Sequence, residues 1–369
     1  MMTIKRCALS VIILINLSIS HAPSFAQKKE RAIIAYYSGN VERLDSFDAK
    51  LMTHIIYCFA HLDSDHIKIK SYRDTVIIQK MVSLKSQNPA LKVLISLGGW
   101  GGCQTCSDIF ATKKGRKQFA KSVRQLNDYF GTNGIDLDWE YPAIEGFPGH
   151  KYTPEDKNNF TSLVYQLRKT LGNKQIITFA AGGFQKFLND AVDWKRVMRK
   201  VDYVNLMTYD LVNGYSPTTG HHTALYSSAQ QPESADNAVQ YLIQKGINPA
   251  KLIIGAAFYS RVWENVPNEN NGLYQQGTFK TSVGFKNFPL KLSQDSGFVF
   301  YWDDVVKAPY AYNAAQKLFA TFDDKRSIEL KSKYVIEKNL GGIMFWQLGD
   351  DTFSDGLLQT INTTLKSQE

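Results

Sequence analysis

Short runs of β-branched and aromatic residues alternate along the chain with longer stretches in which apolar residues recur at helical spacing. This alternation predicts βα units around a parallel sheet. The runs predict eight strands, at residues 32–37, 54–60, 92–97, 134–139, 175–180, 202–207, 251–258 and 341–346. The helical stretches are clearest at residues 74–87, 113–130, 155–171, 190–200, 233–246 and 325–339. Eight parallel strands close a barrel, so we expect an α/β fold, a (β/α)8 TIM barrel.

The interval between the seventh and eighth strands, residues 258–341, is far longer than a βα connection requires. Its first two-thirds is rich in aromatic residues, Gly and Asn. We therefore predict a small α+β insertion, mainly strands, at residues 263–312, with the barrel formed by 27–262 and 313–369. No internal repeat or low-complexity linker is visible, so a separate tethered module is not expected.

The first 26 residues have the pattern of a signal peptide. Lys5 and Arg6 precede an apolar run, and Ser24-Phe25-Ala26 has small residues where a signal peptidase reads. The run is too short to span a bilayer comfortably, and none of that length follows. The pattern predicts cleavage after Ala26 and a secreted protein, extracellular or periplasmic, with no membrane association afterwards. Cys7 begins the apolar run rather than ending it, which argues against a lipid anchor.

Composition excludes several classes of protein. Of 369 residues, 44% are hydrophobic and 21% charged, which is typical of a globular protein with a large core rather than of a disordered tail or a small disulfide scaffold. The net charge of +9 is modest and interpreted as scattered, so no nucleic-acid partner is indicated. We expect a monomer.

Three cysteines follow the predicted cleavage site. Cys103 and Cys106 are two residues apart in a Gly-rich loop, where an oxidising compartment would favour a disulfide between them. A zinc site would need two more ligands at suitable spacing, and none is evident. Cys58 is interpreted as a buried free thiol. No metal and no cofactor is expected.

The segment from Asn133 to Pro142 carries the most informative polar pattern. Alternate side chains of a strand share a face, so Asp136, Asp138 and Glu140 point one way and the apolar residues between them the other. Any one of them could be a cap or a turn former, but three at period two in an apolar strand indicate function. Crowded carboxylates raise at least one pKa, and Glu140, at the C-terminal end of the strand, is the natural proton donor.

This segment closely resembles the Asp-x-x-Asp-x-Asp-x-Glu signature of family 18 glycoside hydrolases, the chitinases and their relatives, on the fourth strand of a (β/α)8 barrel. Ser96-Leu97-Gly98-Gly99-Trp100 resembles the family's Ser-x-Gly-Gly motif, and Met207-Thr208-Tyr209-Asp210 resembles its Met-x-Tyr-Asp motif. Tyr259-Ser260-Arg261 and Trp346 also match. The insertion falls where many members carry a domain that lines one side of the substrate cleft. The resemblance covers essentially the whole chain after the signal segment.

The resemblance implies substrate-assisted, retaining hydrolysis of chitin or N-acetylglucosamine oligosaccharides. Glu140 would protonate the glycosidic oxygen and then act as base, Asp138 and Tyr209 would orient the substrate acetamido group, and Asp136 would share a proton or hydrogen bond with Asp138. Aromatic and polar residues at strand ends are candidates for contacts with sugar. They are Trp346, Trp100, Asp210, Met207, Tyr259, Arg261, Tyr36 and Phe59. For Tyr36 and Phe59, packing in the barrel core is an equally good interpretation.

One position departs from the family pattern, because Asn133 stands where the first Asp is usual. It lies furthest from the proton donor, so we expect tuning or structural support there rather than loss of activity. Two alternatives remain open. The chain could be an endo-β-N-acetylglucosaminidase acting on N-glycans, or a chitin-binding lectin without turnover, although lectins of this family have lost the donor Glu that is present here.

Overall fold

The computed structural model of the chain describes residues 30–367. The predicted signal peptide at residues 1–26 therefore lies outside the described residues. Contacts divide the chain into residues 1–30 and 31–369, and the architecture below is that of the second unit. None of the helices in residues 30–367 combines the length and hydrophobicity that a bilayer crossing requires.

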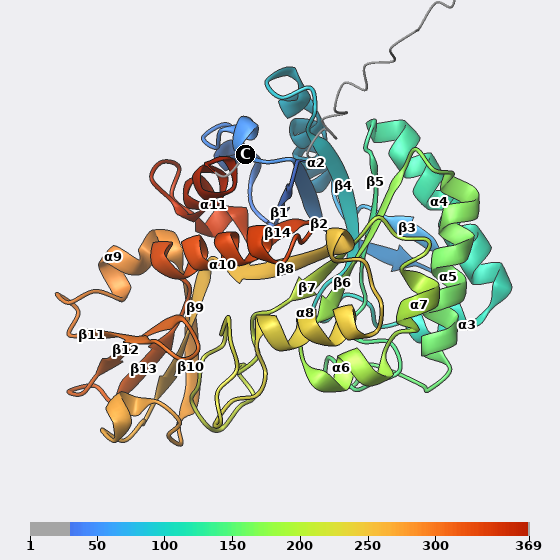
Figure 1. Ribbon diagram of the computed structural model, residues 1–369. Coiled ribbons are helices and arrows are strands. Elements are labelled where there is room, and N and C mark those ends of the chain that lie inside the picture. The colour runs from blue at the N-terminus through green and yellow to red at the C-terminus, as the bar shows by residue number, and fades with distance from the viewer. Residues whose placement is uncertain (1–29, 368–369) are drawn as a thin grey trace, which may run out of the picture. The chain divides into compact units, whose positions relative to one another are not determined.

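Eight parallel strands form a closed barrel (Figure 1). They are β1 (Ala32–Tyr37), β2 (His54–Asp63), β4 (Lys92–Gly98), β5 (Gly134–Asp138), β6 (Ile176–Gly182), β7 (Tyr203–Met207), β8 (Leu252–Ala257) and β14 (Gly342–Trp346). The pairing of β1 with both β14 and β2 closes the ring. A short strand, β3 (His66–Lys68), extends β2 as an antiparallel hairpin. The predicted (β/α)8 barrel is confirmed.

Helices pack around the outside of the barrel (Figure 1). The longer ones are α2 (Tyr72–Ser83), α4 (Lys113–Phe130), α5 (Asp156–Leu171), α8 (Ala235–Gln244), α10 (Lys325–Glu337) and α11 (Leu357–Lys366). The shorter ones are α1 (Val41–Leu44), α3 (Cys106–Ala111), α6 (Gln185–Asp190) and α7 (Trp194–Val197). The prediction of one helix at 190–200 is wrong, because Asp193 caps a new, four-residue helix there.

Local sequence explains where the helices begin and end. At the start of α4 the Thr112 side chain accepts a hydrogen bond from the Gly115 backbone, and at its end Gly131 adopts a left-handed conformation with φ 72°. Such caps satisfy backbone groups that have no partner within the helix. Between the caps, Phe119, Ala120 and Val123 are buried against the barrel, as their spacing predicts.

Side chains of the barrel strands alternate between two cores. On β5, Ile135 and Leu137 point outward and pack against the helices. Asp136 and Asp138 of the same strand lie on the opposite, interior face, and both are buried. The fourth strand thus presents carboxylates to the inside of the barrel.

The insertion between β8 and β14 is built on a five-stranded antiparallel sheet, seen beside β8 at the lower left of Figure 1. Its order is β10 (Thr278–Gly284), β9 (Tyr259–Glu264), β13 (Leu318–Thr321), β12 (Ala308–Asn313) and β11 (Val299–Asp303). A short helix, α9 (Phe288–Lys291), follows β10. The sheet extends beyond the expected range 263–312 at both ends, because Val262 and Ala320 belong to its hydrophobic core.

A fully buried ion pair joins this insertion to the barrel. Lys331 of α10 lies 2.7 Å from Asp323, just after β13, and neither side chain is exposed. Thr223 donates to Asp323 at 2.8 Å and accepts a hydrogen bond from Lys331. The Ala257 backbone, at the end of β8, donates to the same carboxylate at 3.0 Å. Burial lowers the pKa of Lys331, and the charge of Asp323 opposes this effect. The buried ammonium group therefore depends on Asp323 to remain charged.

Candidate active site

The site lies at the C-terminal ends of the barrel strands, where barrel enzymes place their chemistry. Asp136 is the most enclosed of its groups, with no exposed surface. One carboxylate oxygen accepts hydrogen bonds from Tyr36 at 3.1 Å and Ser96 at 2.7 Å. The other accepts from Thr178 at 2.6 Å and Asn205 at 3.2 Å. Burial raises the pKa of Asp136, and these four donors oppose the rise.

Asp138 is nearly as buried but has an unused acceptor. It is 4% exposed, and its Oδ1 has no hydrogen-bond partner among the described residues. Burial, followed by the charges of Glu140 and Asp136, raises its pKa well above the ordinary range. The four hydrogen bonds that Asp136 accepts come from Tyr36, Ser96, Thr178 and Asn205, and the proton or hydrogen bond shared with Asp138 that the resemblance implies stays a prediction. A buried acceptor without a partner is costly and invites a donor from a ligand.

Glu140 follows β5 and is partly exposed at the barrel mouth. Burial raises its pKa to about 7, a hydrogen bond with Tyr141 lowers it, and the charge of Asp210 raises it further. A carboxyl group with this pKa is substantially protonated at neutral pH and can donate that proton.

Glycines of the strand β4 motif allow the backbones to approach closely. A Cβ on Gly98 would lie 2.1 Å from the carbonyl oxygen of Asp138, and its φ of 109° is one that other residues rarely adopt. The next backbone N–H, of Gly99, donates to that same oxygen at 2.9 Å. This contact holds the end of β5 against β4, and with it the carboxylate pair.

Residues after β7 and β8 form a second charged group beside the first. Arg261 makes a two-pronged contact with Asp210, with distances of 2.7 and 2.6 Å. His222 Nδ1 lies 3.4 Å from the same carboxylate. Burial would raise the pKa of Asp210, but hydrogen bonds from His222 and Arg261 outweigh it, and the pKa lies below the ordinary range. Asp210 is therefore ionised, and its backbone has a positive φ of 54°.

Tyr209 and Tyr259 stand between the two groups. Their rings meet edge-on with centroids 6.3 Å apart, and burial raises the pKa of both hydroxyls. The Tyr209 hydroxyl lies 3.8 Å from the sulfur of Met344. It makes no stronger contact among the described residues, so it remains able to hydrogen-bond a ligand.

Trp346 ends β14 and packs against two aromatic side chains. Phe59 stacks on it with ring centroids 5.6 Å apart and an interplanar angle of 13°, and Tyr36 is tilted at 6.2 Å. Tyr36 is 2% exposed and its hydroxyl binds Asp136, so it faces the carboxylates rather than open surface. Met207 packs in the same interior cluster. The peptide bonds Cys58–Phe59, Glu140–Tyr141 and Trp346–Gln347 are cis.

Trp100 lies at the outer edge of the site and is 46% exposed. Its ring is within 6.3 Å of those of Tyr141, Phe147 and Tyr215, measured between centroids. Exposed aromatic rings that are held by neighbours provide platforms for the apolar faces of sugars.

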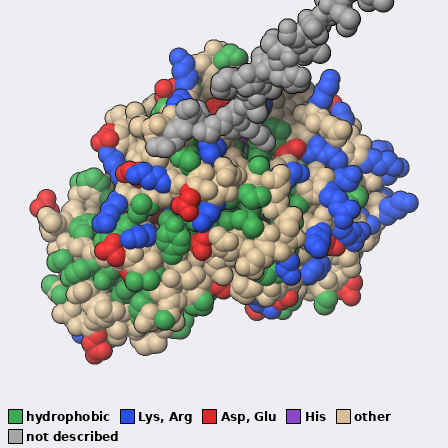
Figure 2. All heavy atoms as spheres, in the orientation of Figure 1, with side chains coloured by type: hydrophobic (Ala, Val, Ile, Leu, Met, Phe, Trp, Pro, Cys, Tyr) green, Lys and Arg blue, Asp and Glu red, His purple; other side chains and the backbone are tan. Residues whose placement is uncertain are grey.

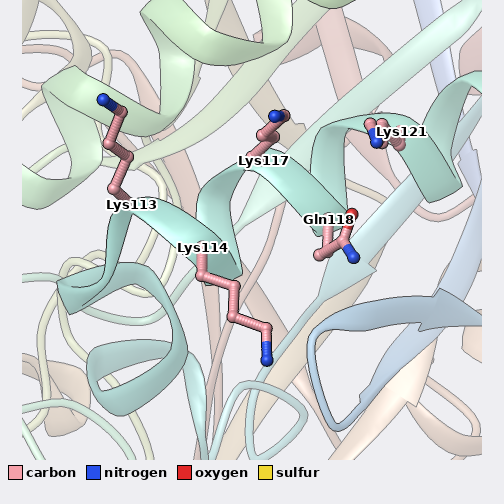
Figure 3. A pocket seen from close by; sticks show the side chains of 5 residues that line it. All are labelled: Lys113, Lys114, Lys117, Gln118 and Lys121. Carbon is pink, nitrogen blue, oxygen red and sulfur yellow. The ribbon is translucent and has the colours of Figure 1, made fainter.

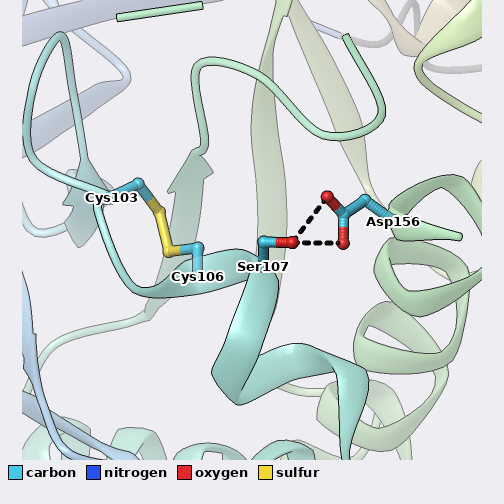
Figure 4. The surroundings of a disulfide bond; sticks show 4 residues. All are labelled: Cys103, Cys106, Ser107 and Asp156. Carbon is cyan, nitrogen blue, oxygen red and sulfur yellow. Dashed lines mark hydrogen bonds between the residues drawn. A yellow bond between two sulfur atoms is a disulfide. The ribbon is translucent and has the colours of Figure 1, made fainter. Parts of the chain in front are cut away.

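The Gly-rich loop after β4 contains a disulfide. Cys103 and Cys106 are bonded, and the adjacent Ser107 donates to both carboxylate oxygens of Asp156 at 3.0 and 2.9 Å (Figure 4). Cys58 is a buried free thiol, as expected. Within residues 30–367 no group of three or more His, Cys, Asp or Glu side chains could hold a metal.

Sequence reasoning missed several residues of the site. Thr178 and Asn205 bind Asp136, Tyr141 contacts Glu140, and His222 contacts Asp210. Each is a single polar residue within or after an apolar strand. One sequence signal could have indicated Thr178 and Asn205. In each strand the alternation of side chains places this polar residue on the interior face of the barrel, where Asp136 also lies.

Positive charge is less scattered than the sequence interpretation held. Four lysines, Lys113, Lys114, Lys117 and Lys121, line a shallow hollow of about 400 Å³ on α4 together with Gln118 (Figure 3). Figure 2 shows Lys and Arg side chains gathered at the right of the view, where Figure 1 places α4. This surface is on the outer helices, away from the carboxylates.

Comparisons with known proteins indicate the family of the chain. The model of the glycosyl hydrolases family 18 matches residues 32–351. Chitinase A1 of Niallia circulans is 34% identical over 298 residues, covering 74% of this chain and 42% of the relative. Chitotriosidase-1 of Mus musculus is 33% identical over 330 residues, covering 83% and 68%. A solved family 18 N-acetylglucosaminidase from Paenibacillus barengoltzii superposes with TM-score 0.83 at 34% identity, covering 91% of this chain and 100% of that one.

Proposed function

Since the chain belongs to family 18 of the glycosyl hydrolases, we propose that it is a secreted chitinase. It hydrolyses β-1,4 bonds between N-acetylglucosamine units with retention of configuration. The observation that carries the proposal is the pair at the end of β5: a proton donor, Glu140, with a pKa of about 7, beside a buried acceptor on Asp138 without a partner. Relatives named as chitinases support the choice of polymer.

In the proposed mechanism Glu140 gives its proton to the oxygen of the glycosidic bond that breaks. The substrate's own acetamido oxygen attacks the anomeric carbon, and Asp138 Oδ1 accepts a hydrogen bond from the acetamido N–H. Positive charge on the resulting oxazolinium ring favours the ionised form of Asp138, so the contact strengthens as the reaction proceeds. Glu140, now ionised, takes a proton from the water that opens the ring.

The surrounding residues position the sugar. Trp346 forms the floor under the reacting unit, Tyr209 donates to the acetamido group, and Trp100 offers a platform further along. Asp136 lies next to Asp138 on the interior face of β5 and raises the pKa of Asp138, and its four donors hold it in place. Asp210 and Arg261, already paired with each other, are available to sugar hydroxyls at the side of the insertion.

A second candidate is an N-acetylglucosaminidase that removes single units, because a family 18 enzyme of that name matches over its whole length. An endo-acting enzyme on N-glycans and a lectin are the remaining alternatives. Secretion is proposed from the first 26 residues. Expression of the full chain in an exporting bacterium would test it, with Gln27 expected as the new N-terminus.

The test is proton NMR of the purified protein with N-acetylglucosamine hexamer, recording product length and the anomer that forms first. Prompt β-anomeric short oligomers are expected from a retaining chitinase. Release of monomer alone would favour the N-acetylglucosaminidase. An unchanged hexamer with folded protein would contradict both, and release of glycan from a high-mannose glycoprotein would then identify the N-glycan enzyme.

A further inference from the structure

A hollow of about 280 Å³ lies beside Trp346, at the ends of β1 and β14. It is lined by Ser38, Gly39, Asn40, Arg43, Arg73, Lys286, Gln347, Gly349 and Asp350. Ser38 follows β1 and donates its backbone N–H to the side chain of Gln347, the residue after Trp346, at 2.9 Å. Lys286 comes from the insertion, so both parts of the fold contribute to the hollow. Its size is at the small end of ligand pockets and suits about one sugar ring.

The lining carries three cationic side chains and one carboxylate. Lys286 is 3.8 Å from Asp350 and also donates to the carbonyl of Gly349 at 2.6 Å. Neither Arg43 nor Arg73 forms an ion pair with a carboxylate of residues 30–367. The hollow therefore has an excess of positive charge.

Arg43 is held in place without being neutralised. Its guanidinium lies 4.4 Å above the ring of Phe353 and donates to the carbonyl of Asp351 at 3.4 Å. Its Nε is buried and has no hydrogen-bond partner among the described residues, and the same is true of Asn40 Oδ1. An ordered guanidinium with an unused donor is suited to a planar anion such as a carboxylate.

The order of strands around the barrel indicates which end of the substrate would reach the hollow. β5, which carries Glu140 at its end, is the fourth strand from β1, and β14 is the eighth, on the opposite side of the ring. If the reacting sugar lies on Trp346 and its leaving group lies at Glu140, the far side of Trp346 receives the non-reducing part of the chain. The cationic hollow is lined by residues that follow β1 and β14, on the side of the ring away from β5.

We propose that this hollow binds a carboxylate on a sugar at the non-reducing side of the substrate, so that the enzyme prefers acidic N-acetylglucosamine oligosaccharides to neutral ones. This inference rests on the proposed function for the orientation of the sugar chain. Arg43 and Arg73 form the charged contacts, and Lys286 adds attraction from the insertion. The contacts discriminate between sugars and take no part in bond cleavage.

The test measures binding to the Glu140→Gln variant, in which turnover does not interfere. The probes are N-acetylglucosamine oligomers of two to five units, either neutral or oxidised to a C6 carboxylate on the non-reducing terminal sugar. Calorimetry at low salt is expected to give a Kd about tenfold lower for the acidic probe of the length that reaches the hollow, and this preference should weaken with added salt. Adding Arg43→Gln and Arg73→Gln should reduce the ratio to about twofold or less, because the remaining cation, Lys286, is already paired with Asp350.

Lys114→Gln with Lys117→Gln is the matched control, since it removes two positive charges from α4 and should keep the preference. If the variant that lacks both arginines does not fold, Arg73→Gln alone still tests the proposal, because this side chain is exposed and its loss should lower the preference for the acidic probe. Equal affinity for acidic and neutral probes at every length, or a tenfold preference that survives loss of both arginines, would overturn the proposal. Failure of every probe to bind would contradict the chitinase proposal as well, whereas neutral binding without preference would contradict only this inference.

Discussion

Glu140 faces two opposing requirements. Its pKa of about 7 suits the proposed role of proton donor at neutral pH, but the same rise from 4.5 destabilises the folded protein at pH values where the group must ionise. A raised folded-state pKa gives stability that is complete below pH 4.5 and lost as the pH rises to about 7. The site therefore lowers the stability of the fold at and above neutral pH.

Glu140→Gln should remove this effect together with catalysis. Turnover of the hexamer should fall at least ~100-fold, because an amide cannot donate the proton. At pH 8 the free energy of unfolding should rise by about 1–3 kcal/mol, and at pH 4.5 it should match wild type. Denaturant unfolding at both pH values measures this, and a gain of equal size at both would contradict the assignment.

The pH dependence of wild-type activity follows from the same group. kcat/KM should decrease as the pH rises through about 7, since the donor loses its proton. Tyr141 lowers the Glu140 pKa by its hydrogen bond, so Tyr141→Phe should move this decline to higher pH. A wild-type profile that is flat from pH 6 to 9 would show that Glu140 is not the donor, and identical declines in the two proteins would contradict the hydrogen bond between Tyr141 and Glu140.

Asn133 illustrates a departure from the family signature that the structure explains. It precedes β5, and its side-chain oxygen accepts the Val93 backbone N–H at 2.9 Å, at the opposite end of the strand from Glu140. A carboxylate can accept the same bond, so Asn133→Asp should leave kcat/KM within about twofold of wild type. A tenfold loss in steady-state kinetics would mean that this position influences the site through the strand.

Among elements, the eight barrel strands and helix α4 could be predicted because period-two and helical patterns are local in sequence. The inward direction of Asp136 and Asp138 followed from the same periodicity. Thr178 and Asn205 could not be assigned to Asp136, because the register that pairs Thr178 with Asp136 and the curvature that brings β7 near it belong to the assembled sheet and not to local sequence. The limits of the insertion were missed because β9 begins immediately after β8, without a turn residue to separate them.

The element junction at Lys331 should be the most sensitive point of the insertion. Lys331→Met would leave Asp323 buried and unpaired, and we expect a loss of about 3–5 kcal/mol in the free energy of unfolding. Lys333→Met, on the same helix and in an exposed pair with Glu329, is the control and should change it by less than about 0.5 kcal/mol. Comparable losses in the two variants by denaturant unfolding would rule out a special role for the buried pair.

At the scale of the whole molecule, both the barrel and the insertion contribute side chains to the proposed site. The barrel supplies the carboxylates and Trp346, and the insertion supplies Arg261 and Lys286 beside them. The position of the insertion was visible in the sequence as an overlong interval. Its strand order was not, because β9 pairs with β13, whose residues lie more than fifty positions away.

The ends of the insertion meet at one hydrogen bond, from the Ala257 backbone to the Asp323 side chain. A chain that passed directly from the end of β8 to the start of α10 would need only a short turn to close this gap. None of the eight barrel strands lies between Ala257 and Asp323, so excision of this segment should leave the order of the barrel strands unchanged. The buried pair of Asp323 and Lys331 lies at the point where the chain returns from the antiparallel sheet to the barrel.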